Sequence, residues 1–130
     1  MLNDILPDPP AGEYLQACKT WIRVLKTLRE DNASLINRLA AALKETMHRP
    51  FIEEAEEFQL TMLDREESLV LLRHEVGEQL TWLELQPENQ PAPHQYAVLK
   101  NDVEGMVQEY ERIKLAFLIF IAAEKEKMKE

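Results

Sequence analysis

Apolar residues recur every three or four positions along most of the chain, and the strict alternation typical of strands is absent. This spacing places the apolar side chains on one face of an α-helix. Three such stripes follow one another: Cys18, Trp21, Leu25, Leu28, Asn32, Leu35 and Leu39; then Phe51, Ala55, Phe58, Met62, Arg65, Leu69, Leu72 and Val76; then Leu99, Val103, Met106, Tyr110, Ile113, Phe117 and Phe120. An average step of about 3.5 residues is typical of helices that wrap around one another. The pattern predicts an all-α protein.

Prolines divide the chain between these stripes. They lie in the first dozen residues, at position 50, and between positions 87 and 93, and proline is poorly tolerated inside a helix. We therefore expect an extended tail over 1–12, then one domain over 13–130 with helices at about 13–47, 51–85 and 94–128. Short connections favour antiparallel neighbours, which predicts an elongated, antiparallel up-down-up three-helix bundle with coiled-coil-like packing.

The first helix has one weak point, at Asp31 and Asn32. Either residue is a good N-cap, so a break there, followed by a fourth short helix, is the alternative to one continuous helix. Asn32 and Arg65 also interrupt the apolar stripes, and counting outward from the first connection places them at the same level. We expect a buried polar layer that fixes the helix register. The alternative is a small polar binding site.

Charge is distributed unevenly along the chain. There are 15 Lys and Arg against 24 Asp and Glu, a net charge of -9. Residues 13–49 carry seven basic and four acidic side chains, and residues 50–86 carry two basic and ten acidic ones. Opposite signs favour pairing of the first two helices. The expected ion pairs are Lys19 and Arg23 with Glu78 and Glu75, and Lys44 with Glu53 and Glu54.

The acidity also argues against a nucleic-acid partner, because an acidic domain repels the phosphate backbone. The only candidate basic stripe is Lys19, Arg23 and Lys26. A solvated face that complements the acidic second helix is the alternative interpretation of that stripe. We expect no nucleic acid to bind.

The acidic run Glu53-Glu54-Ala55-Glu56-Glu57 is the strongest candidate for chemistry. It resembles the EExxE half of the motif in all-α nucleoside-triphosphate pyrophosphatases of the MazG type. The resemblance implies carboxylates that bind Mg²⁺, here Glu53, Glu54 and Glu57, in a metal-dependent nucleotide phosphohydrolase. The second half of that motif, ExxD on the following helix, is missing. An acidic first turn at the positive end of a helix dipole is the alternative. We expect no catalytic residue, metal or cofactor, and keep the phosphohydrolase as the second hypothesis.

Nine consecutive apolar residues, positions 115–123, would cover every side of the third helix. A membrane span needs about 20 apolar residues, so we expect no membrane insertion. A three-helix bundle covers only part of each helix, and a large exposed apolar patch indicates an interaction site. The sequence therefore predicts a homodimer. The expected interface residues are Leu115, Phe117, Leu118, Ile119, Phe120 and Ile121 of the third helix, with Ile36 and Leu43 of the first.

The cellular setting is inferred from two further features. Cys18 is the only cysteine, so no internal disulfide forms, and the first residues lack the basic and apolar segments of a secretory signal. Both favour the cytoplasm. The hypothesis from sequence is a non-enzymatic helical scaffold that self-associates through the third helix and presents an acidic face to an unknown protein partner.

Overall fold

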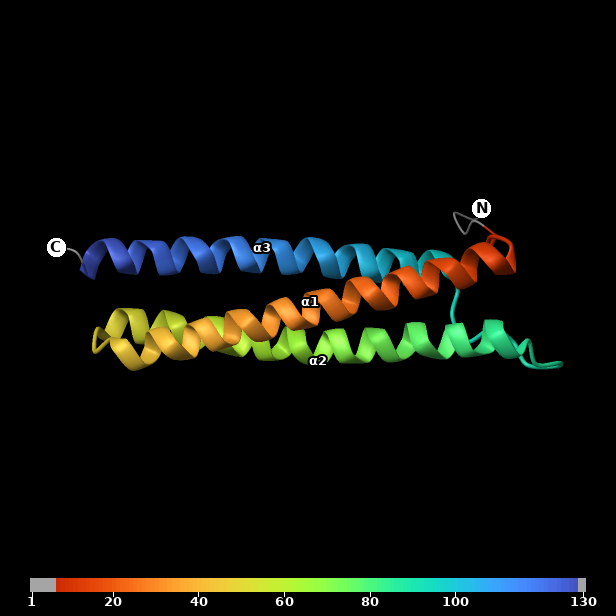
Figure 1. Cartoon of the computed structure of the whole chain (residues 1–130), viewed down its shortest axis with the longest axis horizontal. Helices are drawn as coiled ribbons and strands as arrows, with labels where there is room; N and C mark the ends of the chain where they lie inside the picture. Colours follow the sequence, from red (N-terminus) through yellow and green to blue (C-terminus); the bar gives the residue numbers. More distant parts are fainter. Residues whose placement is uncertain (1–6, 129–130) are drawn as a thin grey trace, which may run out of the picture.

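The computed structural model describes residues 7–128 and contains three long helices and no strand within that range. They are α1 (Ala11–Glu45), α2 (Arg49–Leu85) and α3 (Tyr96–Met128). Helices α1 and α3 run in one direction and α2 in the other, side by side along an elongated molecule (Figure 1). The predicted antiparallel three-helix bundle is confirmed.

The helix boundaries differ from the expected ones by about two residues. Helix α1 begins directly after Pro10, whose carbonyl oxygen accepts hydrogen bonds from the backbone of Glu13 and Tyr14. It continues without interruption through Asp31, so the described residues contain neither the break nor the fourth helix. Pro50 lies in the first turn of α2, where its missing N–H has no partner to lose. Of the predicted tail, residues 1–6 lie outside the described part of the chain.

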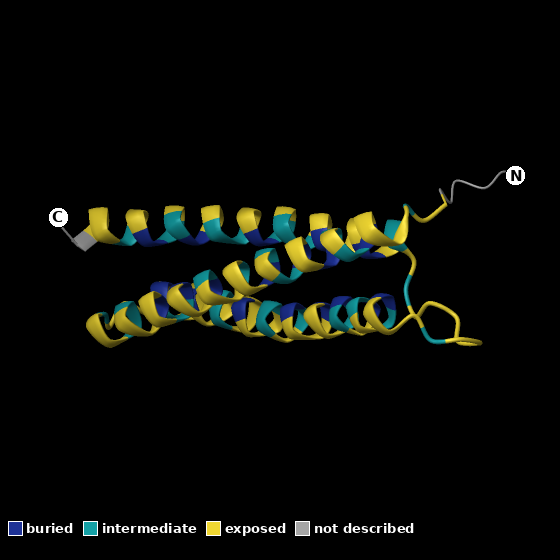
Figure 2. Ribbon diagram, turned by 45° about the vertical axis from the view of Figure 1, so that its right-hand side comes forward, coloured by how far each residue is buried: buried dark blue, intermediate teal, exposed yellow. Residues whose placement is uncertain are grey.

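The core follows the predicted stripes and divides into two clusters. One surrounds Tyr14, Trp21 and Leu99 near the connection between α2 and α3, and the other surrounds Leu39 and Phe117 at the opposite end. In Figure 2 the buried positions of each helix face the other helices, and the exposed positions face outward. Spacing alone therefore identified the inner face of each helix.

The end of the bundle near residue 94 is held by hydrogen bonds that the sequence did not predict. The Tyr14 hydroxyl donates to the backbone carbonyl of His94 at 2.9 Å. The His94 backbone N–H donates to Oε1 of Gln79 at 3.0 Å, and Gln79 is fully buried. Asp8 accepts a hydrogen bond from the backbone N–H of Tyr96, the first residue of α3. These contacts fix the start of α3 against the other two helices.

Candidate functional site

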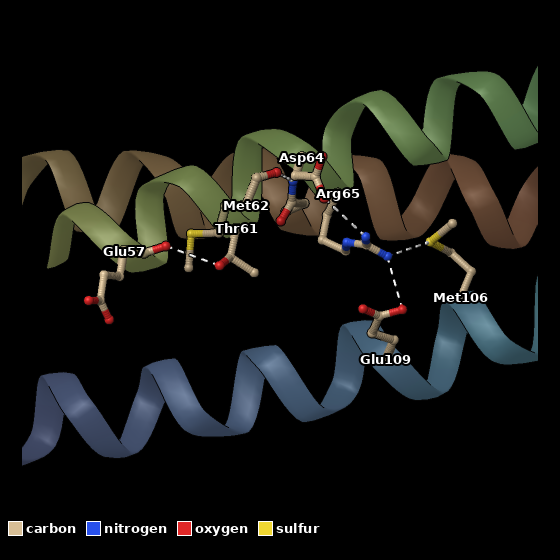
Figure 3. Close-up of polar contacts among 8 residues, drawn as sticks. Glu57, Thr61, Met62, Asp64, Arg65, Met106 and Glu109 are labelled. Atoms are coloured by element: carbon tan, nitrogen blue, oxygen red, sulfur yellow. Dashed lines mark hydrogen bonds and ion pairs between the residues drawn. The ribbon is translucent and has the colours of Figure 1, made fainter. Parts of the chain in front are cut away.

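A polar layer crosses the middle of the bundle between the two core clusters. Asn32 is fully buried, and its Nδ2 donates to the backbone carbonyl of Met62 at 3.0 Å. Arg65 is half-buried, and its guanidinium points toward α3, where Nη1 lies 3.0 Å from a carboxylate oxygen of Glu109 and 3.9 Å from the sulfur of Met106 (Figure 3). Asn32 contacts Met62, which lies about one helical turn before Arg65 on α2. The expectation that Asn32 and Arg65 lie side by side is therefore correct to within one turn.

A second group of contacts joins α1 to α3 at the same height. Asp31 accepts hydrogen bonds from the Tyr110 hydroxyl and from Nζ of Lys114, the latter at 3.0 Å. The hydrogen bond from Tyr110 holds the pKa of the Asp31 carboxyl below its usual value. Burial, and then the nearby Asp31, raise the pKa of the Tyr110 hydroxyl. An ion pair between Arg29 and Glu66 links α1 to α2 close by.

These contacts favour the structural interpretation of the polar layer. Each one connects two different helices and fixes how far one helix is shifted along another. Two buried atoms, Oδ1 of Asn32 and Nε of Arg65, have no hydrogen-bond partner among the described residues. A buried polar atom without a partner lowers stability, so the layer specifies register at some energetic cost.

The acidic run at the start of α2 does not form a metal centre in the part of the chain that the structure describes. Glu53, Glu54 and Glu57 are all exposed, and no three His, Cys, Asp or Glu side chains within residues 7–128 are grouped closely enough to hold an ion. No observation therefore favours the phosphohydrolase. Cys18 is buried in the core, and burial raises the pKa of its thiol to about 11, so the thiol is protonated at neutral pH and is a poor nucleophile.

The ion pairs expected between the ends of α1 and α2 are wrong. Within residues 7–128, no ion pair joins Lys19 or Arg23 to Glu75 or Glu78, or Lys44 to Glu53 or Glu54; the ion pair between these two helices, Arg29 with Glu66, lies near their centre instead. Lys19, Arg23 and Lys26 are exposed on α1. Long basic side chains on an outer face remain in water because an exposed pair adds little stability.

The apolar run of α3 is divided between the core and the surface. Phe117 is 0% exposed and Ile121 is also buried, so both belong to the core of their own chain, a correction to the expected dimer interface. The reason is geometric, because positions 117 and 121 share the helix face of Tyr110, which packs inward. By contrast, Leu115 is 61% exposed and Ile119 62% exposed.

The other expected interface residues are half-buried. Phe120 stacks on Phe51, with ring centroids 4.7 Å apart, and on Phe58, with centroids 5.0 Å apart. Leu118, Ile36 and Leu43 pack at the margin of the same core cluster. The outer surface of the run is therefore Leu115 and Ile119, together with the exposed Ala116, Ala122 and Ala123. We call these five residues the α3 outer face.

Helix α2 carries a second exposed apolar surface, which the sequence analysis missed. Leu60 is 70% exposed, Leu71 60%, and Leu63 and Val70 more than 40%. We call these four residues the α2 leucine face. They lie on the flank and outer side of α2, away from the inward-facing Met62 and Leu69.

Two surface grooves adjoin these faces. The larger, of about 940 Å³, lies along the second half of α2 and the proline-rich connection, with Val70, Trp82 and Pro91 among its lining residues. The other, of about 460 Å³, lies between the start of α2 and the end of α3, and Phe58 and Ile119 contribute to its walls. Both grooves are partly apolar and open to solvent.

Comparison with known proteins identifies no relative. No protein-family model matches the chain, and neither the curated proteins nor the solved structures contain a match. Across residues 7–128, none of the three helices combines the length and the apolar character needed to cross a membrane.

Proposed function

We propose that the chain is a non-enzymatic helical scaffold that self-associates through the α3 outer face and presents the acidic outer surface of α2 to a protein partner. The observation that carries this proposal is the exposure of Leu115 and Ile119 beyond 60% in a chain that already has a complete core. Removing a leucine or isoleucine side chain from water contributes about 1.5–3 kcal/mol. Contiguous exposed apolar side chains are typical of interaction sites.

Self-association is the simplest way to cover the α3 outer face. Twofold dimers are the commonest protein assemblies, and their interfaces use the same surface on both copies. Phe117 and Ile121 pack inward, so a dimer formed through Leu115 and Ile119 leaves each monomer core intact. The oligomer interface is therefore smaller than the run of nine residues that the sequence suggested.

The α2 leucine face supports the second part of the proposal. Its leucines lie among exposed carboxylates, including Glu56, Asp64 and Glu67. An apolar stripe flanked by acidic side chains complements an amphipathic helix with basic flanks, because the stripe supplies affinity and the charges supply orientation and selectivity. The expected protein partner presents such a helix.

Light scattering coupled to size-exclusion chromatography tests self-association. The unmodified protein should elute as a dimer at high micromolar concentration, and Ile119→Glu should shift it to the mass of a monomer, because the substitution places a charge in the interface. Leu60→Glu is the matched control. It adds the same charge at an equally exposed leucine of the α2 leucine face, and the dimer should persist.

A monomer of the unmodified protein at high micromolar concentration contradicts self-association. If Leu60→Glu dissociates the dimer and Ile119→Glu does not, the interface lies on α2 instead. Circular dichroism should show unchanged helix content in both variants, since both positions are exposed. A loss of helix content in Ile119→Glu would show that the position is needed for folding rather than for assembly.

A further inference from the structure

The groove of about 940 Å³ runs along one side of the second half of α2, with Arg29 of α1 at its edge and the connection to α3 at its far end. We call it the α2 groove. Its floor follows the spacing of a single helix side, because lining residues of α2 recur every three or four positions. Among them are Val70, Arg73, Gly77, Thr81 and Leu85.

The connection forms an apolar wall at the far end of the α2 groove. Gln86 ends α2 in the left-handed conformation. The indole N–H of Trp82 donates to the backbone carbonyl of Gln90 at 3.2 Å, which attaches the connection to the helix. Proline rings are rigid, so this wall has little conformational freedom to lose when a ligand binds. The apolar side chains gathered here are Trp82, Leu85, Pro87, Pro91 and Pro93.

Gly77 gives the middle of the α2 groove an open floor. A methyl group added there would meet no atom within 4 Å beyond the neighbouring backbone of its own helix. Glycine is unfavourable in a helix interior, but it allows another backbone to approach closely. A ligand in the α2 groove would therefore explain a glycine that the packing of the chain does not require.

The other end of the α2 groove is basic, although α2 as a whole is acidic. Arg73 is exposed on the floor and has no ion pair among the described residues. Glu78 is the carboxylate that the described lining contains, and its Oε1 lies 3.3 Å from Nε2 of His94. An unpaired guanidinium favours a carboxylate, which it binds through two parallel hydrogen bonds.

The basic stripe of α1 borders this end of the α2 groove. Arg29 pairs with Glu66, so the antiparallel direction places Lys26 level with position 69 and Lys19 level with position 76. Helical spacing places both lysines on the side of α1 that carries Arg29. Both are exposed, and within residues 7–128 neither has an ion pair. The positive charge of Arg73 is therefore reinforced from α1.

Other carboxylates near the α2 groove limit where an acidic ligand can lie. Glu75 lines a different hollow, toward α3. Four exposed carboxylates lie beyond the two ends without contributing to the described lining, Glu30 and Glu67 at the basic end and Glu84 and Glu88 at the apolar end. Like charges repel, so the carboxylates of a ligand are confined to the stretch around Arg73.

We propose that the α2 groove binds an extended peptide segment of a partner protein, with carboxylates at Arg73 and a large apolar side chain against Trp82. The nine positions between these residues span about 13 Å at helical rise, a distance that an extended peptide covers in about four residues. The α2 groove contains no residue of the α3 outer face and only Val70 of the α2 leucine face. The inference therefore goes beyond the proposed function and does not depend on self-association.

Fluorescence anisotropy with the full chain tests this site. The probe is an amidated, fluorescein-labelled peptide of three glutamates, a Gly-Ser-Gly spacer and a terminal Leu-Phe pair. It should bind saturably with a Kd below about 1 mM, and a counterpart with glutamine in place of glutamate should bind roughly fivefold more weakly. In ¹H–¹⁵N spectra the glutamate peptide should shift the indole resonance of Trp82 and leave that of the buried Trp21 in place.

Charge reversal tests the basic end. Arg73→Glu should weaken binding of the glutamate peptide by roughly tenfold, because it replaces attraction by repulsion at the carboxylate contact. Arg38→Glu is the matched control. Arg38 is also exposed, lies outside the α2 groove and has no ion pair among the described residues, so the affinity should remain within about twofold.

Filling the floor tests the position of the ligand. Gly77→Leu should abolish binding of the glutamate peptide, because the new side chain projects into the α2 groove. Gly105→Leu on α3 should leave binding unchanged. Both positions have open space for a side chain, and leucine favours the helix more than glycine does, so both variants should fold. Circular dichroism checks this.

The remaining outcomes decide between occupants. The inference is wrong if the glutamate peptide shows no saturable binding up to about 1 mM, or if Arg73→Glu and Arg38→Glu weaken it equally. Tighter binding of a lysine counterpart, or displacement of the glutamate peptide by labelled oligothymidine, also overturns it. A Trp82 resonance that shifts on dilution of the protein alone would assign the α2 groove to a second copy. If a monomeric protein binds the glutamate peptide as expected, the inference stands and self-association fails.

Discussion

Asn32 is a polar residue in an otherwise apolar stripe, and its side chain makes one hydrogen bond where its amide has the capacity for more. Its Nδ2 donates to Met62, whereas its Oδ1 is buried without a partner among the described residues. A buried polar group is costly when unpaired, and its value lies in excluding shifted arrangements in which it would meet only apolar side chains. An apolar residue at position 32 would therefore favour stability, whereas the polar Asn32 favours a single helix register.

Substitution at Asn32 should separate these two effects. Asn32→Leu should raise the free energy of unfolding by about 1 kcal/mol, because it removes the unpaired acceptor and adds apolar contacts. Asn32→Asp should lower it by about 3 kcal/mol or more, because it buries an unpaired charge. Urea denaturation measures both changes. If Asn32→Leu is as destabilising as Asn32→Asp, the Asn32 amide contributes net stability, which contradicts this prediction.

The Asp31 carboxyl should make stability depend on pH in the acid range. The hydrogen bond from Tyr110 lowers its pKa in the folded state, so its contribution is complete above the unfolded pKa of about 4 and is lost as the pH falls through the lower folded pKa. The difference in unfolding free energy between the natural protein and Asp31→Asn should therefore shrink as the pH falls below about 4. Urea titrations from pH 7 to pH 3 check this.

Glu67→Gln is the control for the pH experiment. Glu67 is an exposed carboxylate that has no ion pair among the described residues, so its replacement should leave the shape of the pH profile unchanged. A profile that changes equally in both variants would attribute the effect to overall charge rather than to the contact between Asp31 and Tyr110.

Helices α2 and α3 each contain one interior glycine, at positions 77 and 105. Neither has a positive φ, and a methyl group added at either position would meet no atom within 4 Å beyond the neighbouring backbone of its own helix. Glycine in the middle of a helix lowers stability by roughly 0.5–1 kcal/mol relative to alanine, because the unfolded chain is more flexible. These two residues weaken their helices without a packing requirement that explains them.

Gly105→Ala and Gly77→Ala should each raise the free energy of unfolding by roughly 0.5–1 kcal/mol. The two effects should add, because the substitutions lie on different helices and contact none of the same atoms. Thermal and urea denaturation measure them. A loss of stability in either variant would mean that the glycine is needed for a contact with another molecule, such as the second copy or the partner.

For the molecule as a whole, the sequence predicted the architecture but not how the surface divides into functional parts. Helix number, direction and inner faces followed from spacing and prolines, because these depend on local geometry. The third stripe already contained Phe117, yet the run of apolar residues around it led to its assignment to the dimer interface as well. A side chain that is buried in the core of its own chain cannot also form a dimer interface. The packed structure shows that Ile119, not Phe117, lies on the surface.

Contacts that join distant parts of the chain were the least predictable. Gln79 occupies an inner position of α2 because the backbone of His94 donates to it, and this partner comes from a connection whose path no helical pattern specifies. The α2 leucine face was not predicted as a separate exposed surface, because the apolar stripe of α2 specifies only the inner side of that helix. The polar layer was foreseen because Asn32 and Arg65 both fall on apolar stripes.

An odd number of antiparallel helices places the start of α1 and the end of α3 at opposite ends of the molecule, about 50 Å apart at helical rise (Figure 1). Tension applied between Ala11 and Met128 would therefore act along the helix axes. It would place the packing interfaces between the helices under shear. Contacts in shear yield together rather than one after another. Under tension the bundle should consequently be stiff, extending little until a whole helix separates from the other two.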